Sequence, residues 1–248
     1  MSKIALITGA SRGIGAATAE LAAAEGYDVV VNYAQDGDAA AQVVERCKAH
    51  GRRAIALQAD IADPAAVEAM FSDCDSALGT PDLLVNNAGI IGQASRLVDL
   101  TPDALQRMMA VNLFGTIYCS QAAARRMSTA QGGRGGAIVN ISSIAAVLGS
   151  PGEYVHYAAS KGAIETLTIG LGKELGPEGI RVNCIRAGTA DTEIHSRSGN
   201  PGRPEMVARV APLGRVAAPR DIAAAALWLA SPDAGYVTAS ILPVAGGL

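Results

Sequence analysis

Short apolar runs alternate along this chain with longer segments of helical periodicity. The runs that we expect to form strands are Ile4–Ile7, Val29–Val31, Ala54–Leu57, Leu83–Val85, Ala137–Ile141 and Arg181–Ile185. Runs this short and apolar are typical of parallel strands that are buried on both faces and joined by helical crossovers. The alternation therefore predicts an α/β fold, a doubly wound parallel sheet of about seven strands with helices on both faces.

Helix-start signals support this prediction. A first helix is expected from Gly13 to Glu25, and Asp63-Pro64 and Thr101-Pro102 introduce further helices over 65–78 and 103–109. Proline at the first helical position, after a capping side chain, is a common start signal. Glycines over 131–136 predict a flexible surface turn, and the Ser-, Gly- and Pro-rich stretch 189–204 predicts a mobile loop over a site.

Length and composition indicate one large domain, residues 1–248. Of the 248 residues, 50% are hydrophobic and 17% charged, which allows a sizeable core, and no Pro/Ser-rich linker divides the chain. No run approaches the roughly 18 apolar residues of a membrane helix, and Met1-Ser2-Lys3 leads into a strand pattern rather than a secretory segment. We therefore expect a cytoplasmic protein without membrane association.

Charge and metal-ligand patterns exclude other classes. The formal net charge is −3 and aromatic residues make up 4%, which argues against a nucleic-acid partner because such surfaces need clustered basic side chains and stacking rings. The four cysteines and three histidines show neither C-x-x-C nor a helical pair; they are Cys47, Cys74, Cys119, Cys184, His50, His156 and His195. No metal site is predicted.

A glycine-rich turn from Thr8 to Gly15 follows the first strand and leads into the first helix. It contains Gly9, Ser11, Arg12, Gly13, Ile14 and Gly15. Glycines there let the backbone approach a pyrophosphate, whose charge is favoured by the amides and dipole at the helix N-terminus. The spacing is G-x-x-x-G-x-G rather than the common dinucleotide fingerprint. A turn of this kind also occurs for purely structural reasons.

The end of the second strand bears on cofactor preference. It reads Val31-Asn32-Tyr33-Ala34, without the acid that usually binds the ribose 2′-hydroxyl of NAD, and Asp36 comes late. Arg12, inside the turn, offers a guanidinium for a 2′-phosphate. The sequence therefore favours NADP(H), with NAD(H) still possible, and Arg12 as a solvated loop residue is the alternative.

Tyr157 and Lys161 stand four residues apart at the start of a helical run, so both side chains lie on one helix face. A free tyrosine has a pKa near ~10, and a neighbouring ammonium favours the phenolate. We expect Lys161 to lower the pKa of Tyr157 toward that of a general acid or base. By itself, such a pair is more often an ordinary solvated face.

Two serines, Ser142 and Ser143, end the strand that precedes this helix, at the sheet edge where ligands bind in such folds. With them the chain resembles the classical short-chain dehydrogenase/reductase family over nearly its whole length. The resemblance rests on Thr8 to Gly15, Asn86-Asn87-Ala88-Gly89, Asn112, Ser143, and Tyr157-Ala158-Ala159-Ser160-Lys161, in that order.

The resemblance implies a single-domain Rossmann fold and a role for each matching residue. Ser143 would hydrogen-bond the substrate oxygen, with Ser142 as the alternative, Tyr157 would transfer its proton, and Lys161 would hold the nicotinamide ribose. Asn112 would anchor a water in the proton relay. Further cofactor contacts are implied for Asn32, Asp60, Ile61, Asn87, Ala88, Gly89, Gly188 and Thr192, with Asn87 mainly tying strands together.

This chain departs from the family pattern at two positions. Ala187 precedes Gly188 where the family usually has proline, which loses a fixed φ beside the nicotinamide, and Ala245 stands where aspartate is common. Both departures concern loop rigidity and C-terminal contacts rather than reacting groups. In the substrate loop, Glu153, Tyr154 and His156 are candidates for substrate contact.

Three functions remain open: an NADP(H)-dependent oxidoreductase for a small carbonyl or alcohol, a dinucleotide sensor without turnover, and a dehydratase or epimerase on the same fold. The first is favoured because Ser143, Tyr157 and Lys161 are all present. Broad apolar faces over 114–124 and 163–171, together with the resemblance, predict a homotetramer.

Overall fold

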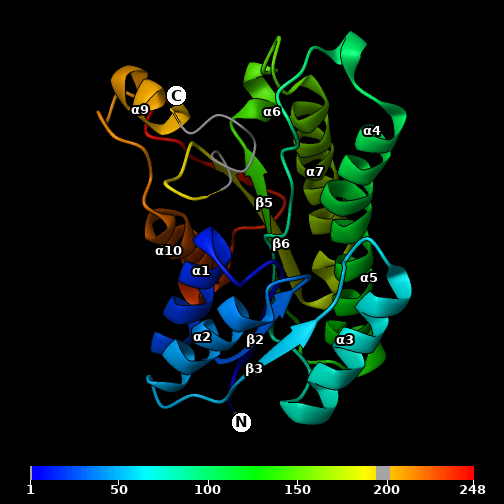
Figure 1. Cartoon of the computed structure of the whole chain (residues 1–248). Helices are drawn as coiled ribbons and strands as arrows, with labels where there is room; N and C mark the ends of the chain where they lie inside the picture. The colour runs from blue at the N-terminus through cyan, green and yellow to red at the C-terminus, as the bar shows by residue number, and fades with distance from the viewer. Residues whose placement is uncertain (1, 194–201) are drawn as a thin grey trace.

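The computed structural model describes residues 2–193 and 202–248 and contains one seven-stranded parallel sheet. The strands are β1 Ile4–Ile7, β2 Asp28–Tyr33, β3 Ala54–Gln58, β4 Leu83–Asn86, β5 Gly136–Ser143, β6 Ile180–Ala187 and β7 Ile241–Val244. Their order across the sheet is β3-β2-β1-β4-β5-β6-β7, and all six pairings are parallel. The predicted doubly wound fold is confirmed (Figure 1).

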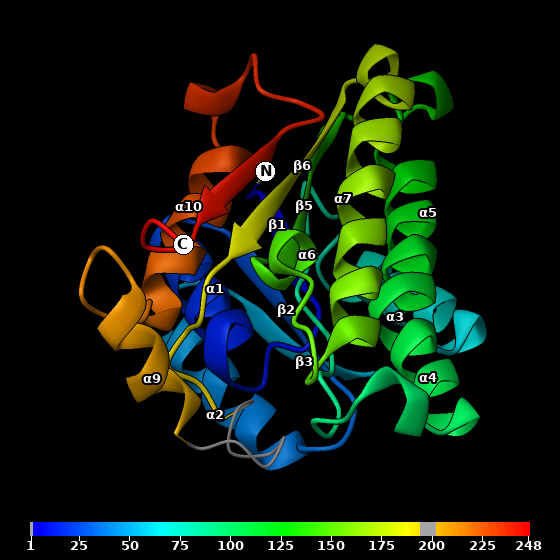
Figure 2. The same ribbon diagram turned by 90° about the horizontal axis from the view of Figure 1, so that it is seen from above.

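Helices cover both faces of the sheet. They are α1 Gly13–Ala24, α2 Gly37–Lys48, α3 Pro64–Ala77, α4 Pro102–Met109, α5 Gly115–Met127, α6 Ala145–Leu148, α7 Val155–Glu174, α9 Arg203–Val210 and α10 Pro219–Ala230. Figure 2 shows α1 and α10 on one side of the sheet and α5 and α7 on the other. The connections after β1, β4, β5 and β6 therefore meet at the carboxyl edge, where ligands bind in open parallel sheets.

Two apolar cores flank the sheet because successive strand residues point to opposite faces. Ala5, Ile7 and Val31 pack with α1, α2 and α10, whereas Leu6 and Val30 pack with α3 and α5. Both faces of the sheet bury side chains from several strands, so the sheet is a rigid platform for the loops at its edge. The sheet core is what places residues distant in sequence at one site.

Several element boundaries differ from the sequence prediction. The seventh strand, β7, was not expected from its short run, which contains Pro243, and it pairs with β6 at the edge of the sheet. Between α4 and α5 the chain continues as a π-helix, Ala110–Phe114. The stretch 189–204 is not wholly a loop, because α9 begins at Arg203. Residues 194–201 of that stretch, with His195, lie outside the described residues.

Helix starts follow the predicted capping chemistry. The Asp63 side chain accepts a hydrogen bond from the amide of Ala65 ahead of α3, and Thr101 does the same for Ala104 ahead of α4. By contrast, the residue before α1, Arg12, makes no side-chain capping hydrogen bond. The first amides of α1 are thus left for another acceptor. Across the described ranges, no helix is long and apolar enough to cross a membrane.

Candidate active site

The glycine turn between β1 and α1 is shaped by close backbone contacts. Gly9 and Gly13 have φ of +60° and +56°, in the left-handed region. A Cβ on Gly9 would lie 2.8 Å from Ala88 Cα, and one on Gly15 would lie 2.5 Å from Asn87 Nδ2. Larger residues do not fit at either position. The turn thus forms a tight cradle beneath the uncapped start of α1, which suits a pyrophosphate.

Asn87 and Ala88, directly after β4, brace this cradle from the neighbouring strand. The Asn87 side-chain amide donates to the backbone oxygens of Thr8 and Gly9 at 2.9 and 3.0 Å. In return, the Thr8 hydroxyl oxygen accepts the amides of Asn87 and Ala88, each at 3.0 Å. The structure thus agrees with the strand-tying role that was implied for Asn87.

Asn32, at the end of β2, holds the same turn from the other side. Its Oδ1 accepts the amide of Gly9 at 3.1 Å, and its Nδ2 donates to the backbone oxygens of Leu57 and Ala59 at 3.3 and 3.1 Å. The side chain is buried. Any contribution of Asn32 to cofactor binding is therefore through the position of Gly9.

Charged residues gather where an adenosine ribose would lie, beyond β2. Arg12 forms an ion pair with Asp36, which also caps α2, and a second with Glu193 at 3.2 Å. Asp60 pairs with Arg107 at 2.8 Å and accepts the amide of Ala62 at 3.0 Å. The Arg12 guanidinium thus reaches the segment after β2, where it is already paired with two carboxylates.

Of two other predicted cofactor residues, Ile61 packs against the start of α5 and Thr192 packs against the cradle. Ile61 is buried, and its side chain lies 2.7 Å from where a Cβ on Gly115 would stand. The Thr192 side chain lies 3.2 Å from where a Cβ on Gly13 would stand, so the stretch after β6 closes onto the glycine turn.

Tyr157, in the first turn of α7, and Ser143, at the end of β5, are brought together by the fold, and the Ser143 hydroxyl is close enough to lower the pKa of Tyr157 in part. Ser142 instead turns toward Glu165, at 3.0 Å, and toward the backbone oxygen of Lys161. The geometry thus favours Ser143 over Ser142 as the serine beside the reacting oxygen.

Lys161 lies one turn further along α7, with Nζ 5.8 Å from the Tyr157 ring centre. Its ammonium donates to the backbone oxygen of Ile141 at 2.8 Å, and the side chain is buried. Burial lowers the pKa of Lys161 to about 8, and Cys184 acts weakly in the opposite direction. Lys161 can therefore change protonation state near neutral pH.

The pKa of Tyr157 differs from the sequence expectation. Burial raises the pKa of Tyr157, while the hydrogen bond from Ser143 and the positive charge of Arg203 lower it in part. Lys161 is not among these causes, because its ammonium is directed at Ile141. The expectation that Lys161 brings the pKa of Tyr157 below the ordinary value was wrong for this arrangement, in which desolvation dominates.

Asn112 lies in the π-helix and faces the loop after β4. Its side chain exchanges hydrogen bonds with the backbone of Ile90, at 2.8 and 2.9 Å, and donates to Ser160 at 3.1 Å. A Cβ on Gly89 would lie 3.3 Å from Asn112 Oδ1 and 3.4 Å from Lys161 Nζ. Because Gly89 has no side chain, Asn112 Oδ1 and Lys161 Nζ can both lie next to it.

The substrate side is bordered by the loop before α7 and by the start of α9. Glu153 and Arg203 form an ion pair, and the Arg203 guanidinium lies 5.5 Å from the Tyr154 ring centre. His156 is buried, its Nδ1 has no hydrogen-bond partner among the residues that the structure describes, and burial lowers its pKa. Glu153 is therefore the most accessible of the three predicted substrate residues, whereas Tyr154 and His156 form the wall behind it.

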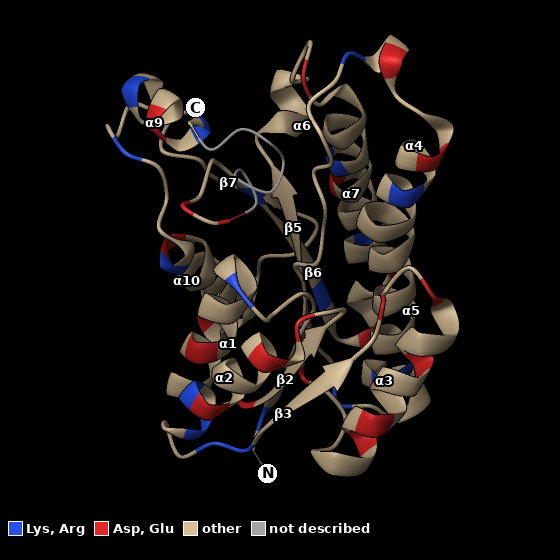
Figure 3. Cartoon of the chain, viewed as in Figure 1, with Lys and Arg blue, Asp and Glu red and all other residues tan. Residues whose placement is uncertain are grey.

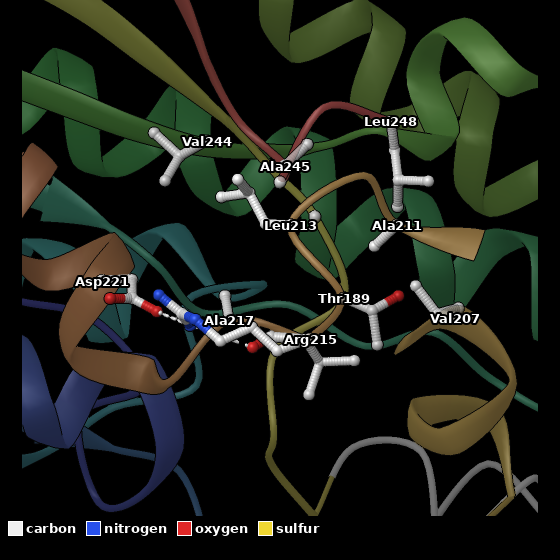
Figure 4. A pocket seen from close by; sticks show the side chains of 13 residues that line it. Thr189, Val207, Ala211, Leu213, Arg215, Ala217, Asp221, Val244, Ala245 and Leu248 are labelled. Carbon is white, nitrogen blue, oxygen red and sulfur yellow. Dashed lines mark hydrogen bonds and ion pairs between the residues drawn. The ribbon is translucent and has the colours of Figure 1, made fainter. Parts of the chain in front are cut away.

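A separate cavity of about 230 Å³ lies between α9, the loop after β6 and the C-terminus. Figure 4 shows Val207, Ala211, Leu213 and Leu248 lining it, with an Arg215–Asp221 ion pair at one side. It includes Gly188 and Ala245 but none of Ser143, Tyr157 and Lys161. A Cβ on Gly188 would lie 2.7 Å from Ala245 Cα, so one departure from the family pattern, Ala245, packs against the residue that follows the other, Ala187.

Sequence reasoning missed three charged residues near the site. Arg203 is the first residue of α9, Glu165 lies eight residues after Tyr157 on the same face of α7, and Arg186 is the residue before Ala187. The helical spacing of Tyr157, Lys161 and Glu165 was the available signal for one of them. The pairing of Arg186 with Glu165 could be found only from the structure. Figure 3 shows Lys and Arg dispersed over separate helices, strands and loops.

Within residues 2–193 and 202–248, no group of three or more His, Cys, Asp and Glu side chains is placed to hold a metal ion. The site combines a pyrophosphate cradle at the start of α1 with a serine, a tyrosine and a lysine at the ends of β5 and α7. A cradle of this kind next to a serine, a tyrosine and a lysine at the carboxyl edge of a parallel sheet is typical of one class, the dinucleotide-binding oxidoreductases.

Comparisons with known proteins agree with this class. The family model described as "Enoyl-(Acyl carrier protein) reductase" matches residues 9–248. Uncharacterized oxidoreductase YgfF of Escherichia coli (strain K12) is 49% identical over 98% of this chain and 99% of its own length. L-rhamnose 1-dehydrogenase (NAD(P)(+)) of Sphingomonas sp. (strain SKA58) is 41% identical over 99% and 96%.

The solved structure of a short-chain dehydrogenase from Burkholderia cenocepacia J2315 in complex with NADP superimposes with a TM-score of 0.90. It is 38% identical and covers 99% of this chain and 97% of its own. The chain belongs to the classical short-chain dehydrogenase/reductase family of NAD(P)-dependent oxidoreductases.

Proposed function

We propose that this protein is an NADP(H)-dependent oxidoreductase that acts on a small carbonyl or alcohol through Ser143, Tyr157 and Lys161. The observation that carries the proposal is the placement of Tyr157 beside Ser143 at the carboxyl edge of the sheet, with the buried Lys161 Nζ 5.8 Å from the Tyr157 ring centre. The glycine cradle at the same edge supports a dinucleotide next to this pair.

When bound, the nicotinamide supplies or accepts the hydride. In the reducing direction the Ser143 hydroxyl donates a hydrogen bond to the carbonyl oxygen, which becomes more negative as the bond order falls. Tyr157 then transfers its phenolic proton to that oxygen, so an alcohol leaves and a phenolate remains. In the oxidising direction Tyr157 accepts the proton of the alcohol.

Lys161 and Asn112 support the return of the proton to Tyr157. The Lys161 pKa of about 8 lets its ammonium exchange protons in the physiological range. Gly89 brings Lys161 and Asn112 near one another without a side chain between them. We propose that Asn112, held by Ile90 and Ser160, anchors the water through which protons reach this pair.

The preference for NADP(H) is supported by three observations. Arg12, in the turn before α1, reaches Asp36 in the segment after β2 and could meet a 2′-phosphate there, and β2 ends in Asn32 and Tyr33 rather than an acid. The Burkholderia cenocepacia neighbour was solved with NADP. Because Arg12 also pairs with Asp36 and Glu193, a phosphate would have to compete with these carboxylates. NAD(H) is therefore the alternative cofactor.

The test is a screen of ketones, aldehydes and sugars for consumption of NADPH, followed at its absorbance. Tyr157→Phe removes only the transferable proton and is expected to abolish turnover while NADPH still binds. Tyr236→Phe, at a fully exposed tyrosine, is the matched control and keeps native activity. Equal turnover by Tyr157→Phe and native protein would refute the assigned proton donor.

The same screen separates the other functions. Binding of NADPH with no turnover of any probe would indicate a sensor, and product formation without stoichiometric cofactor consumption would indicate a dehydratase or epimerase. We also propose a cytoplasmic homotetramer. Its support is the resemblance together with two exposed apolar side chains, Phe114 at 46% and Ile169 at 38%, and light scattering would measure its mass.

A further inference from the structure

An ion pair that the proposed mechanism does not use lies directly beneath the catalytic residues. Arg186 Nε and Nη2 donate to the two carboxylate oxygens of Glu165, at 2.8 and 2.6 Å. The side chains are 20% and 12% exposed. Two parallel bonds from a planar guanidinium fix both distance and orientation, unlike most exposed salt bridges.

Glu165 extends the catalytic face of α7. Tyr157, Lys161 and Glu165 are spaced by four residues, so they follow one another on one side of the helix. Arg186 is the next-to-last residue of β6 and is the register partner of Ser142 in β5. The ion pair therefore joins α7 to the end of β6, next to the end of β5 that carries Ser143.

Ser142 makes the third connection. Its hydroxyl lies 3.0 Å from Glu165 Oε1 and 3.1 Å from the backbone oxygen of Lys161, so its proton is directed at α7 in either case. The Lys161 ammonium is bound to Ile141, the residue before Ser142, at 2.8 Å. Consecutive residues of β5 thus hold the Lys161 turn at both its backbone and its side chain.

The chain lacks another restraint in the same stretch. Ala187, which follows Arg186, has freedom in φ that proline would remove. Beyond it, the turn is held by the amides of Ile144, donating to Ala187, and Gly188, donating to Val244, at 2.8 and 2.9 Å. An ion pair at Arg186 restrains the strand end immediately before this turn.

We infer that Glu165 and Arg186 are positioning residues, which together with Ser142 set the placement of Tyr157 and Lys161 on α7 relative to Ser143 on β5 and the loop after β6. This inference rests on the proposed function for its catalytic consequence. Displacement of a reacting group by about 1 Å can cost about 100-fold in rate, so a loosened α7 lowers kcat before it affects binding.

The test compares Glu165→Gln, Arg186→Gln and the double variant with native protein. Each single variant is expected to lower kcat about tenfold or more, with KM and the Kd for NADPH within about twofold. The double variant should be no worse than the singles, because the pair acts as one unit. Arg186→Lys keeps the positive charge but cannot form two parallel hydrogen bonds to the carboxylate. It should therefore recover part of the lost kcat.

The matched control is Arg126→Gln, because the Arg126 side chain is 16% exposed, close to the 20% of Arg186, and its ion pairs with Asp75 and Glu68 join α5 to α3 away from the site. It should lower the unfolding temperature with kcat unchanged. Amide hydrogen exchange gives a readout independent of activity: exchange over 141–145 and 186–189 should quicken in Glu165→Gln and stay native in Arg126→Gln.

Two results would overturn the inference: a kcat of Glu165→Gln within twofold of native, or an equal loss in Arg126→Gln. If native protein turns over no probe, the proposed function fails separately. In that case hydrogen exchange decides for the ion pair, because unchanged exchange over 141–145 and 186–189 in Glu165→Gln overturns the positioning role.

Discussion

Thr8→Val tests whether the glycine cradle is held by the neighbouring strand. Thr8 is fully buried, and its hydroxyl oxygen accepts the amides of Asn87 and Ala88, each at 3.0 Å. Valine has nearly the same shape, so the substitution removes the acceptor without opening a cavity. The Asn87 amide retains a contact with the oxygen of Val85 at 3.1 Å, whereas no other acceptor is seen for Ala88 among the described residues.

The expected cost follows from these contacts. Leaving the Ala88 amide unpaired costs about 1–3 kcal/mol, and weakening the Asn87 amide adds about 1 kcal/mol, so the free energy of unfolding should fall by about 2–4 kcal/mol. For a chain of this length the corresponding fall in Tm is roughly 5–15 °C. The Kd for NADPH should rise as well, because Ala88 packs against Gly9 in the cradle.

Urea unfolding and NADPH titration measure both effects. Thr18→Val is the matched control, since Thr18 is equally buried but its hydroxyl only donates to the oxygen of Ile14 at 2.7 Å. It should cost less than about 1 kcal/mol and leave the Kd unchanged. If Thr8→Val were no more destabilising than Thr18→Val, the bracing of the cradle by Asn87 and Ala88 would be refuted.

Three further predictions concern charge and reactivity. Arg12→Ala should reduce the preference for NADPH over NADH in binding titrations, and a strong native preference for NADH would contradict the proposed cofactor. Between pH 8 and 10.5 the folded protein has lost the Lys161 proton that the unfolded chain keeps, whereas below about pH 8 both keep it and the burial penalty is fully present. The free energy of unfolding should therefore rise with pH in that window, relative to Lys161→Met, by up to about 1.4 kcal/mol per pH unit in paired urea titrations. Cys47, Cys74, Cys119 and Cys184 are buried, and burial raises their pKa values to about 12, so none should react with a thiol reagent before unfolding; rapid labelling of native protein would contradict this.

Much of the fold could be predicted because the strands are buried on both faces and so appear as continuous apolar runs. The six expected runs all lie in strands. β7 escaped because Pro243 interrupts its apolar run and argues against a strand, a position that the edge of the sheet tolerates. The π-helix escaped too, since it differs from the helices on either side only in its hydrogen-bond spacing, for which Ala110–Phe114 carry no sequence signal.

The candidate site divides in a similar way. Tyr157 and Lys161 could be paired from helical spacing, and the glycines of the cradle from their place after a strand. The placement of Ser143 beside Tyr157 depends on the packing of α7 against β5, and the ion pair of Glu165 with Arg186 joins residues 21 positions apart. The spacing of residues along one helix or strand can be predicted from the sequence, whereas contacts between different elements cannot.

The sequence by itself determined the alternation of strands and helices, the position of the glycine turn and the presence of Ser143, Tyr157 and Lys161. Only the tertiary structure decided that Ser143 rather than Ser142 meets Tyr157, that Arg12 is shared with two carboxylates, and that burial raises the pKa of Tyr157. The physical reason is that electrostatic effects depend on distance and solvent exclusion, which arise when helices pack on the sheet.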